Sequence, residues 1–351
     1  MKEFYKNKKV LVTGHTGFKG SWLCKCLLHL GANVVGISLD PPTNPNLFEL
    51  TNLKNNIKSI ICDIRDLEQL KNIFLLEQPE IVFHLAAQSI VRESYINPVY
   101  TYETNIMGTI NILECIRMTE SVKSFLNITT DKVYKNREWE WSYREIEELN
   151  GFDPYSNSKS CSELVTDSYK NSFFNNKNIA ISTARAGNVI GGGDFADNRI
   201  IPDCIRAIQN NNTLIIRNPH SIRPYQHVLE PIYAYLLITK MQYKNIKFSS
   251  SYNIGPNDND CITTERLIEF FINAWGNDLK VEIIPSNDFH EAQILKLDCA
   301  KIKSVLKWQP KWNIETAVNK IVDWTRCYIN KEDINKIMEL QIEEFLFDYI
   351  M

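Results

Sequence analysis

The sequence predicts an α/β fold in which a doubly wound parallel sheet is followed by a smaller C-terminal α/β lobe. Two observations support this prediction. In the first half of the chain, short β-branched runs alternate with helical patterns, as expected for a parallel sheet covered on both faces. A glycine-rich turn, Gly14-x-x-Gly17-x-x-Gly20, joins the first of these runs to an apolar helical stripe.

Six strands and three long helices are expected before residue 188. The helix behind the glycine turn is expected to stop at Gly31, a residue that favours helix C-termini. A second helix follows Pro98 towards Arg117, and a third starts at Asp153-Pro154, since Asp caps helices and Pro suits their first turn. The expected strands are 9–13, 33–39, 57–62, 81–86, 124–129 and 179–184.

Composition points to a cytoplasmic globular protein. The chain has 351 residues and a net charge of −3, which gives no reason to expect nucleic acid or an anionic membrane as a partner. No stretch approaches the ~18 apolar residues of a spanning helix, and the apolar run after the basic N-terminus is too short for a secretion signal. Nine scattered cysteines, without a Cys-x-x-Cys pair, suggest neither disulfides nor a metal site.

The glycine turn predicts a Rossmann-like site for NAD. Glycines at these positions let a pyrophosphate approach the backbone N–H groups of the helix start, which includes Phe18 and Lys19. Asp40 ends the next strand, where a carboxylate accepts hydrogen bonds from ribose hydroxyls and repels the 2′-phosphate of NADP. The alternative is a turn that binds nothing. Further candidates for the cofactor are Asp63 and Ile64, for adenine, and Ala86, Ala87 and Gln88, which could equally be ordinary strand ends.

Tyr155 and Lys159 are the predicted catalytic pair, and both are also expected to contact NAD. They share one face at the start of a helix, so the ammonium is expected to lower the pKa of the phenol and let it act as a base. The same spacing occurs at Tyr5/Lys9 and Tyr243/Lys247, where no other chemistry surrounds it. The position of the pair after Asp153-Pro154 distinguishes it from these chance occurrences.

These motifs resemble the extended short-chain dehydrogenase/reductase superfamily. More narrowly, the chain is similar over nearly its whole length to nucleotide-sugar 4,6-dehydratases, and among them to the branch that acts on CDP-glucose. The segments that carry the likeness are 12–23, 39–43, 136–139, 153–159, 185–194, 216–219 and 223–231.

The resemblance implies a lyase reaction in three steps, with NAD as an internal hydride store. Tyr155 and NAD oxidise C4 of the sugar, water is lost across C5 and C6, and hydride returns to C6. The product is a 4-keto-6-deoxy sugar for surface polysaccharide such as O-antigen. By resemblance, Thr130 binds the C4 oxygen and Asp131 protonates the departing 6-hydroxyl.

Lys132 stands where this family usually has a glutamate that removes the C5 proton, and the CDP-glucose branch is known for this lysine. Two roles remain open. A neutral amine could take the proton, or an ammonium could stabilise the negative charge that develops at O4. A third interpretation is an exposed loop lysine with no role.

The resemblance also assigns substrate contacts and domains. Asn188, Arg199 and Arg223 are expected to hold the pyrophosphate, although each arginine could be structural. The arginine that relatives carry near His290-Glu291 has no counterpart here. Residues 1–187, with a returning segment 224–256, are expected to form the NAD-binding domain, and 188–223 and 257–351 mainly the substrate-binding lobe.

Three alternatives stay open. The chain could act on a different nucleotide sugar, or be a nucleotide-sugar 4-epimerase, which needs no acid at Asp131. It could also be a silent NAD-sensing or scaffold protein. Relatives pair through helices near 99–117 and 155–173, so the resemblance implies a homodimer or a tetramer. Ile106, Ile110 and Leu113 fit either that contact or burial against the sheet.

Overall fold

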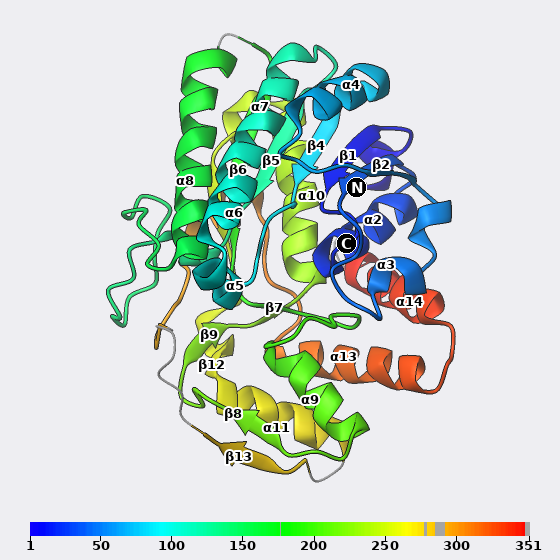
Figure 1. Ribbon diagram of the computed structural model, residues 1–351, viewed down its shortest axis with the longest axis vertical. Helices are drawn as coiled ribbons and strands as arrows, with labels where there is room; N and C mark the ends of the chain where they lie inside the picture. The colour runs from blue at the N-terminus through cyan, green and yellow to red at the C-terminus, as the bar shows by residue number, and fades with distance from the viewer. Residues whose placement is uncertain (176, 277–278, 285–291, 348–351) are drawn as a thin grey trace.

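The computed structural model describes residues 1–175, 177–276, 279–284 and 292–347. Its centre is a sheet of seven parallel strands in the order β3-β2-β1-β4-β5-β6-β11, which is the doubly wound topology that the sequence predicts (Figure 1). The six expected strands are present to within two residues, and the seventh comes from the predicted returning segment. The strands are β1 (Lys9–Thr13), β2 (Asn33–Ser38), β3 (Lys58–Ile61), β4 (Ile81–His84), β5 (Ser124–Ile128), β6 (Ala180–Ala186) and β11 (Ser251–Ile254).

Helices cover both faces of this sheet. Two separate apolar clusters, one on each face, hold the layers together because the strands are buried on both sides. One face carries α4 (Leu67–Glu77), α7 (Gly108–Met118) and α8 (Pro154–Tyr169). The other carries α2 (Phe18–His29), α10 (Leu229–Lys244), α12 (Ala300–Leu306) and α14 (Ile334–Phe347).

The helix boundaries follow the local signals. Gly31 has φ +80° directly after the C-cap of α2, as expected for a left-handed stop. Asp153 caps α8 by accepting a hydrogen bond from the backbone N–H of Ser156 at 2.9 Å. The helix expected after Pro98 is interrupted by a π-helical turn, η2 (Glu103–Met107).

The shorter helical segments are α1 (Lys2–Tyr5), α3 (Leu47–Leu50), η1 (Leu53–Asn55), α5 (Val91–Ile96), α6 (Pro98–Tyr102), η3 (Asp131–Val133), η4 (Lys170–Phe174), η5 (Ile246–Phe248) and η6 (Asp258–Asp260).

A smaller lobe lies beyond the carboxyl end of β6, where the chain leaves the sheet (Figure 1). It has its own apolar core, built from α9, β8, α11 and α13. Its elements are β7 (Val189–Ile190), α9 (Ile200–Gln209), β8 (Leu214–Ile216), β9 (Ile222–Pro224), β10 (Gln226–His227), β12 (Cys261–Thr263), α11 (Thr264–Trp275), β13 (Val281–Ile283) and α13 (Ile314–Ile329).

Apolar contacts between the sheet domain and helices near the C-terminus cross the domain boundary predicted at residue 257. Ile302 of α12 and Phe345 of α14 belong to the same apolar cluster as Trp22 of α2, so these late helices close the large domain. The division into two functional domains therefore stays a prediction, with α12 and α14 packed on the sheet side.

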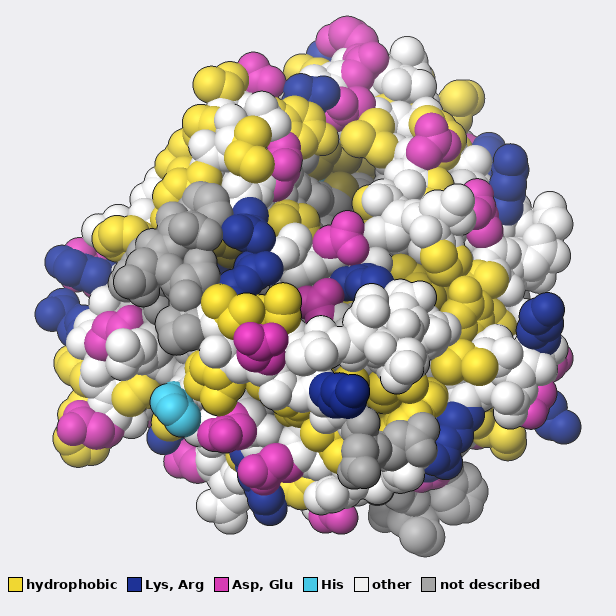
Figure 2. All heavy atoms as spheres, turned by 60° about the horizontal axis from the view of Figure 1, so that its bottom comes forward, with side chains coloured by type: hydrophobic (Ala, Val, Ile, Leu, Met, Phe, Trp, Pro, Cys, Tyr) yellow, Lys and Arg dark blue, Asp and Glu magenta, His cyan; other side chains and the backbone are white. Residues whose placement is uncertain are grey.

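The surface of the lobe end carries both signs of charge. Figure 2 looks onto this end and shows Lys and Arg side chains interspersed with Asp and Glu. Within the described ranges, no helix has the length and apolar character needed to cross a membrane.

The glycine turn is packed too tightly for larger residues at two positions. Gly14 has φ +77°, and a Cβ there would lie 2.8 Å from the backbone nitrogen of Ala86. A Cβ on Gly20 would lie 2.1 Å from the carbonyl oxygen of Gly14, whereas a Cβ on Gly17 would meet the same oxygen at an ordinary 3.5 Å. Close packing at Gly20 thus fixes how α2 leaves β1.

We expect Gly20→Ala to lower the free energy of unfolding by ~1–3 kcal/mol or more, because backbone must move to admit the methyl group. Gly17→Ala is the matched control, and its effect should be under ~1 kcal/mol. Urea unfolding of both variants measures the difference. Equal stability of the Gly20→Ala and Gly17→Ala variants would contradict the packing argument.

Candidate active site

The segment after β5 carries the predicted acid. Thr130 is extended (φ −148°, ψ 160°) and caps the short η3 turn, which begins at Asp131. Its hydroxyl donates a hydrogen bond to Asp131 Oδ1 at 3.0 Å and accepts one from the backbone N–H of Lys132 at 3.4 Å. Asp131 is only 2% exposed. The turn therefore buries the carboxyl and holds it against Thr130.

Tyr155 and Lys159 lie in the first turns of α8 and face this segment. The Lys159 ammonium is buried and donates a hydrogen bond to the carbonyl of Ile128, the last residue of β5, at 3.0 Å. Tyr155 is half-buried, and a hydrogen bond with Thr130 acts to lower its pKa. The structure thus brings together the predicted Thr130, Asp131, Tyr155 and Lys159.

One expectation about Tyr155 was wrong. Burial raises the pKa of Tyr155 to about 12, with Asp131 and Asp153 acting in the same direction, and outweighs the lowering by Thr130 and Arg199. Lys159 is not among the main contributions to this pKa, and its ammonium donates to the Ile128 carbonyl. Burial also lowers the pKa of Lys159 to about 8, assisted by Lys19 and opposed by Glu163.

Asp131 has the properties of a buried acid. Burial raises the pKa of its carboxyl above the usual value despite the nearby Lys132, Thr130, Arg223 and Lys19, which act in the opposite direction. Among the described residues, no side chain or backbone group bonds its Oδ2 atom. A carboxyl with a raised pKa and an oxygen without a partner is better suited to donate a proton than an ordinary aspartate.

Lys19 reaches this centre from the glycine turn. Burial, with Arg199 nearby, lowers the pKa of its ammonium to about 8, whereas Asp131 acts in the opposite direction. The ammonium lies 6.0 Å from the ring centre of Tyr235 on α10. Lys19 was predicted only as a cofactor contact, and the spacing of the motif gave no sign of its proximity to Asp131.

The three predicted substrate residues lie at the junction with the smaller lobe. Arg199 precedes α9 and pairs with Asp194 at 2.9 Å. Arg223 is only 3% exposed, and its guanidinium donates to the carbonyls of Ile222, Ala292 and Gln293. Asn188 lies between β6 and β7, where its backbone carbonyl accepts a hydrogen bond from Gln226. Residues 290 and 291 lie outside the described ranges.

The predicted cofactor residues fit a dinucleotide along the carboxyl edge of the sheet. Gly17 is the N-cap of α2, so the first N–H groups of that helix are directed at the turn. Thr16 anchors the turn by hydrogen bonds to Ser38 and Leu39, immediately before the exposed Asp40. The tight approach of Gly14 to Ala86 leaves no room for a side chain at this turn, and Ala87 follows beside it.

Two predicted cofactor residues are occupied by structural contacts. The buried Gln88 donates to Thr101 and accepts from the backbone of Ile90. Ile64 is 4% exposed and packs so closely on α7 that a Cβ on Gly108 would lie 2.4 Å from its Cδ1. Contact of either side chain with a cofactor stays a prediction.

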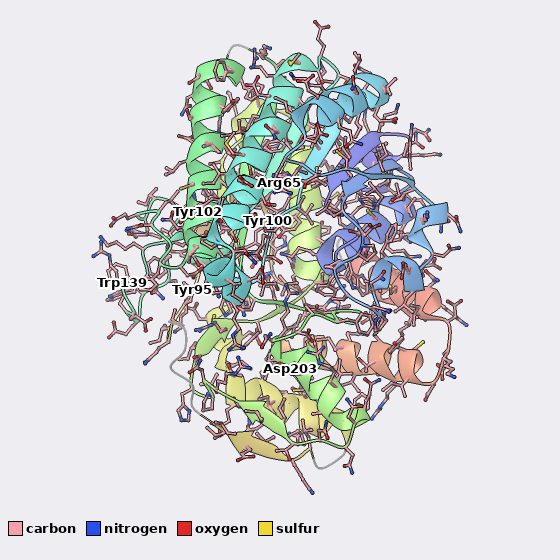
Figure 3. All side chains as sticks on the ribbon, in the orientation of Figure 1. Arg65, Tyr95, Tyr100, Tyr102, Trp139 and Asp203 are labelled. Carbon is pink, nitrogen blue, oxygen red and sulfur yellow. The ribbon has the colours of Figure 1, made fainter. Side chains whose placement is uncertain are left out.

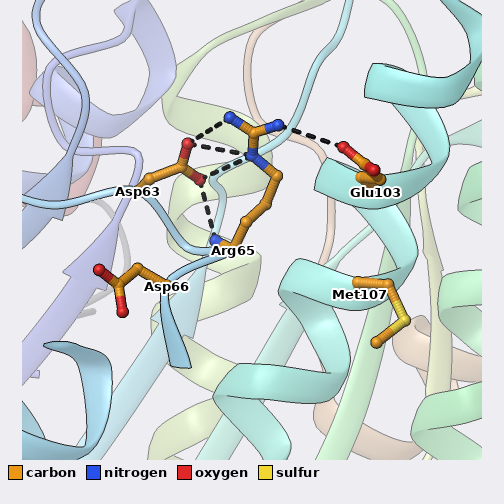
Figure 4. Close-up of a pocket in the computed structure, with 5 residues that line it drawn as sticks. All are labelled: Asp63, Arg65, Asp66, Glu103 and Met107. Atoms are coloured by element: carbon orange, nitrogen blue, oxygen red, sulfur yellow. Dashed lines mark hydrogen bonds and ion pairs between the residues drawn. The ribbon is translucent and has the colours of Figure 1, made fainter. Parts of the chain in front are cut away.

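Asp63 lines a hollow of about 460 Å³ together with Arg65, Asp66, Glu103 and Met107 (Figure 4). Hydrogen bonds from Arg65 hold the pKa of Asp63 below its usual value. Arg65 also pairs with Glu103 at 3.3 Å and lies over the ring of Tyr100 at 4.8 Å (Figure 3). Trp139, by contrast, packs on Tyr143 in the loop that projects at the left of Figure 3.

Two buried charges beside the site were missed. Glu163 (2% exposed) follows Lys159 by one helical turn on α8, and its carboxylate pairs with Arg185 of β6 at 2.8 Å. The spacing Tyr155, Lys159, Glu163 repeats every four residues, and this periodicity was the available signal. No sequence spacing indicated Arg185 as its partner.

Comparison with known proteins identifies the family. A family model described as GDP-mannose 4,6 dehydratase matches residues 11–321. The chain belongs to the GDP-mannose 4,6-dehydratase family. It is 47% identical to the CDP-glucose 4,6-dehydratase of Salmonella typhimurium over 98% of both chains. The dTDP-glucose 4,6-dehydratase of Haemophilus influenzae is 28% identical, over 90% of this chain and 97% of that protein. The chain is accordingly a nucleotide-sugar 4,6-dehydratase, a hydro-lyase.

Solved structures share the fold of this 4,6-dehydratase. The UDP-glucose 4-epimerase of Thermotoga maritima, solved with UDP-glucose, superposes with a TM-score of 0.80 at 25% identity, over 92% of this chain and 99% of that chain. The dTDP-glucose 4,6-dehydratase of Bacillus anthracis, solved with NAD, gives a TM-score of 0.78 at 20% identity, over 93% and 99%. The Rossmann-like sheet with its smaller lobe is therefore common to dehydratases and epimerases.

We expect Asp131→Asn to raise the free energy of unfolding at pH 7. The folded state raises the pKa of Asp131, so ionisation of this carboxyl opposes folding. The penalty is absent below the unfolded-state pKa of ~3.9 and grows as the pH rises towards the folded-state pKa. The gain should therefore shrink as the pH falls towards 4. Urea unfolding across this pH range measures it, with exposed Asp197→Asn as control. A variant less stable than the wild type at pH 7 would contradict the expectation.

Proposed function

We propose that this 4,6-dehydratase converts CDP-glucose to CDP-4-keto-6-deoxyglucose and water, with NAD as its cofactor. The observation that carries the proposal is the 47% identity to a CDP-glucose 4,6-dehydratase over almost the entire chain. The Thr130-Asp131-Lys132 sequence agrees with it, because the resemblance associates lysine at the third position with the CDP-glucose branch. The product would serve deoxysugar synthesis for surface polysaccharide, and O-antigen is one such polymer.

The carboxyl edge of the sheet is the proposed NAD site. Backbone N–H groups at Gly17, Phe18 and Lys19 would bind the pyrophosphate, and Asp40 would bind the adenosine ribose. The hollow beside Asp63 would take the adenine end. When bound, NAD supplies a positively charged ring that takes hydride from C4 and later gives it to C6.

Oxidation at C4 needs a base and a group that orients the hydroxyl. Tyr155 would accept the proton of the C4 hydroxyl, while Thr130, bonded to Asp131 at 3.0 Å, would bind the same oxygen. The Lys159 ammonium, held on the Ile128 carbonyl, keeps a positive charge beside this site. Because burial raises the pKa of Tyr155 to about 12, the phenol needs positive charge nearby to act as a base, and the Lys159 ammonium and a bound nicotinamide ring would supply it.

Loss of water across C5 and C6 needs a proton donor for the 6-hydroxyl and a way to remove the C5 proton. Asp131 is the proposed donor, since burial raises the pKa of its carboxyl above the usual value. Lys132 follows it in the same turn and is half-buried. We propose that the Lys132 ammonium contributes at least in part by stabilising negative charge at O4 as the C5 proton leaves.

The pyrophosphate of the substrate would lie at the junction of the two lobes. Arg199 and Arg223 offer guanidinium groups there, and Asn188 offers an amide. Both arginines influence the catalytic groups, Arg199 through the pKa of Tyr155 and Arg223 through that of Asp131. A nucleotide sugar bound by these residues would therefore place its sugar near the acid and the base.

The test is to incubate the purified protein with CDP-glucose and NAD and to follow the product by mass spectrometry. A product lighter by one water, without accumulation of NADH, supports the proposal. A new isomer of unchanged mass would indicate a 4-epimerase instead. If the protein does not react with CDP-glucose but converts a GDP-, dTDP- or UDP-linked sugar, its substrate carries that other nucleotide.

For Lys132, we expect Lys132→Met to lower kcat on the order of 100-fold and Lys132→Arg to retain most of the activity, because arginine keeps the charge. The measurement is the loss of deuterium from C5 of labelled CDP-glucose. An inactive arginine variant would favour the neutral amine as base. Near-normal C5 exchange in the methionine variant would reject both roles.

We also propose a cytoplasmic homodimer that pairs through α6–α7 and α8. Apolar side chains are exposed on both segments: Val99 (69%) and Met107 (49%) on the first, and Leu164 (55%) on the second. Of the positions considered from sequence, Leu113 is fully buried in the core of the sheet, and Ile106 and Ile110 are half-buried. Light scattering of the protein in solution tests the pairing, and a mass of one chain would reject it.

A further inference from the structure

A buried ion pair lies directly behind the catalytic groups. Glu163 of α8 and Arg185 of β6 have side chains only 2% and 4% exposed, and the Arg185 Nη2 atom donates to Glu163 Oε2 at 2.8 Å. Thr183 of β6 donates to the same oxygen at 2.6 Å. Removal of two charges from water is costly, so this pair is stable only with further hydrogen-bond partners.

The first such partner precedes the proposed catalytic threonine. Thr129 is 5% exposed and donates its hydroxyl to Glu163 Oε1 at 2.5 Å. The next two residues along the chain are Thr130 and Asp131. The Lys159 ammonium bonds to Ile128, the residue before Thr129. Two residues of α8 therefore hold the two residues before the catalytic segment: Lys159 bonds to the backbone of Ile128, and Glu163 to the side chain of Thr129.

The second partner ends the same segment. Tyr134 is 1% exposed, and its hydroxyl accepts a hydrogen bond from Arg185 Nη1 at 2.9 Å and donates one to Asn253 Oδ1 at 2.6 Å. The guanidinium also lies over the Tyr134 ring at 5.2 Å. One ion pair thus contacts both ends of the segment, Thr129 through its carboxylate and Tyr134 through its guanidinium.

We propose that Glu163 and Arg185 are positioning residues that clamp residues 130–133 at both ends and hold Thr130, Asp131 and Lys132 against Tyr155. The inference rests on the proposed roles of those catalytic residues. The clamp, consisting of Thr129, Glu163, Arg185 and Tyr134, touches neither the sugar nor the cofactor in the proposed mechanism. It acts by fixing the position of the acid, which follows β5, relative to the base on α8.

The experiment compares two hydroxyl donors of the same carboxylate. Thr129→Val removes the donor that leads into the catalytic segment, and Thr183→Val removes one on β6 that does not. Both residues are about equally buried, 5% and 4% exposed, and each variant deletes one hydroxyl while keeping its shape. kcat and KM for CDP-glucose, with excess NAD, and thermal unfolding are measured for both.

We expect Thr129→Val to lower kcat on the order of 10- to 100-fold with little change in KM, because a shift of the acid slows chemistry more than binding. Thr183→Val should keep kcat within about twofold, while both variants lose a similar few degrees of Tm. Equal kcat losses in the two variants would overturn the clamp, since a general weakening of Glu163 would then explain both.

A second pair of variants tests the clamp if Thr129→Val does not fold. Tyr134→Phe removes the hydroxyl that bonds to Arg185 at the other end of the segment, and Tyr143→Phe is the control. Tyr143 stacks on Tyr134 at 5.2 Å and is 2% exposed, but its hydroxyl bonds to Asn136. Equal kcat of these two variants likewise overturns the clamp. Wild-type protein that does not turn over CDP-glucose would instead refute the proposed function.

Discussion

The junction between the carboxyl end of β5 and helix α8 is the contact on which the rest of the site depends. Lys159 bonds to Ile128, Glu163 bonds to Thr129, and Thr130 and Asp131 follow at once in the chain. β5 ends at Ile128 and α8 begins at Pro154, so these side-chain bonds, together with packing, set the relative position of the strand end and the helix. The buried ion pair of Glu163 and Arg185 makes this register costly to break.

Burial then determines which groups are charged at the centre. Lys19 and Lys159 each have a pKa of about 8, the pKa of Asp131 is raised, and that of Tyr155 is about 12. In each case removal from water is the largest cause and favours the neutral form. Both the Asp131 carboxyl and the Tyr155 phenol are therefore harder to ionise here than in water. The proposed mechanism uses the first as an acid for the 6-hydroxyl and the second as a base for the C4 hydroxyl.

The arrangement of the two lobes follows from the topology. Because all seven strands run parallel, their carboxyl ends meet at one edge, where the glycine turn and the β5 segment lie together. The chain leaves this edge through β6 to build the lobe that carries Arg199 and Arg223. The fold is shared with a 4-epimerase, so the fold alone does not decide the chemistry. In the proposed mechanism, Asp131 and Lys132 are the residues that would favour elimination over epimerisation.

The sequence by itself determined the sheet, since β-branched runs, the Gly14–Gly20 turn and the Asp153 cap are local signals that neighbours do not override. It also predicted Thr130, Asp131, Tyr155 and Lys159 as site residues from their spacing and from resemblance to a family, and the structure brings these four together. The pKa of Tyr155, the approach of Lys19 to Asp131, and the pairing of Glu163 with Arg185 were decided by tertiary structure alone. Desolvation and contacts between elements depend on what surrounds a side chain in space, and no local pattern contains that information.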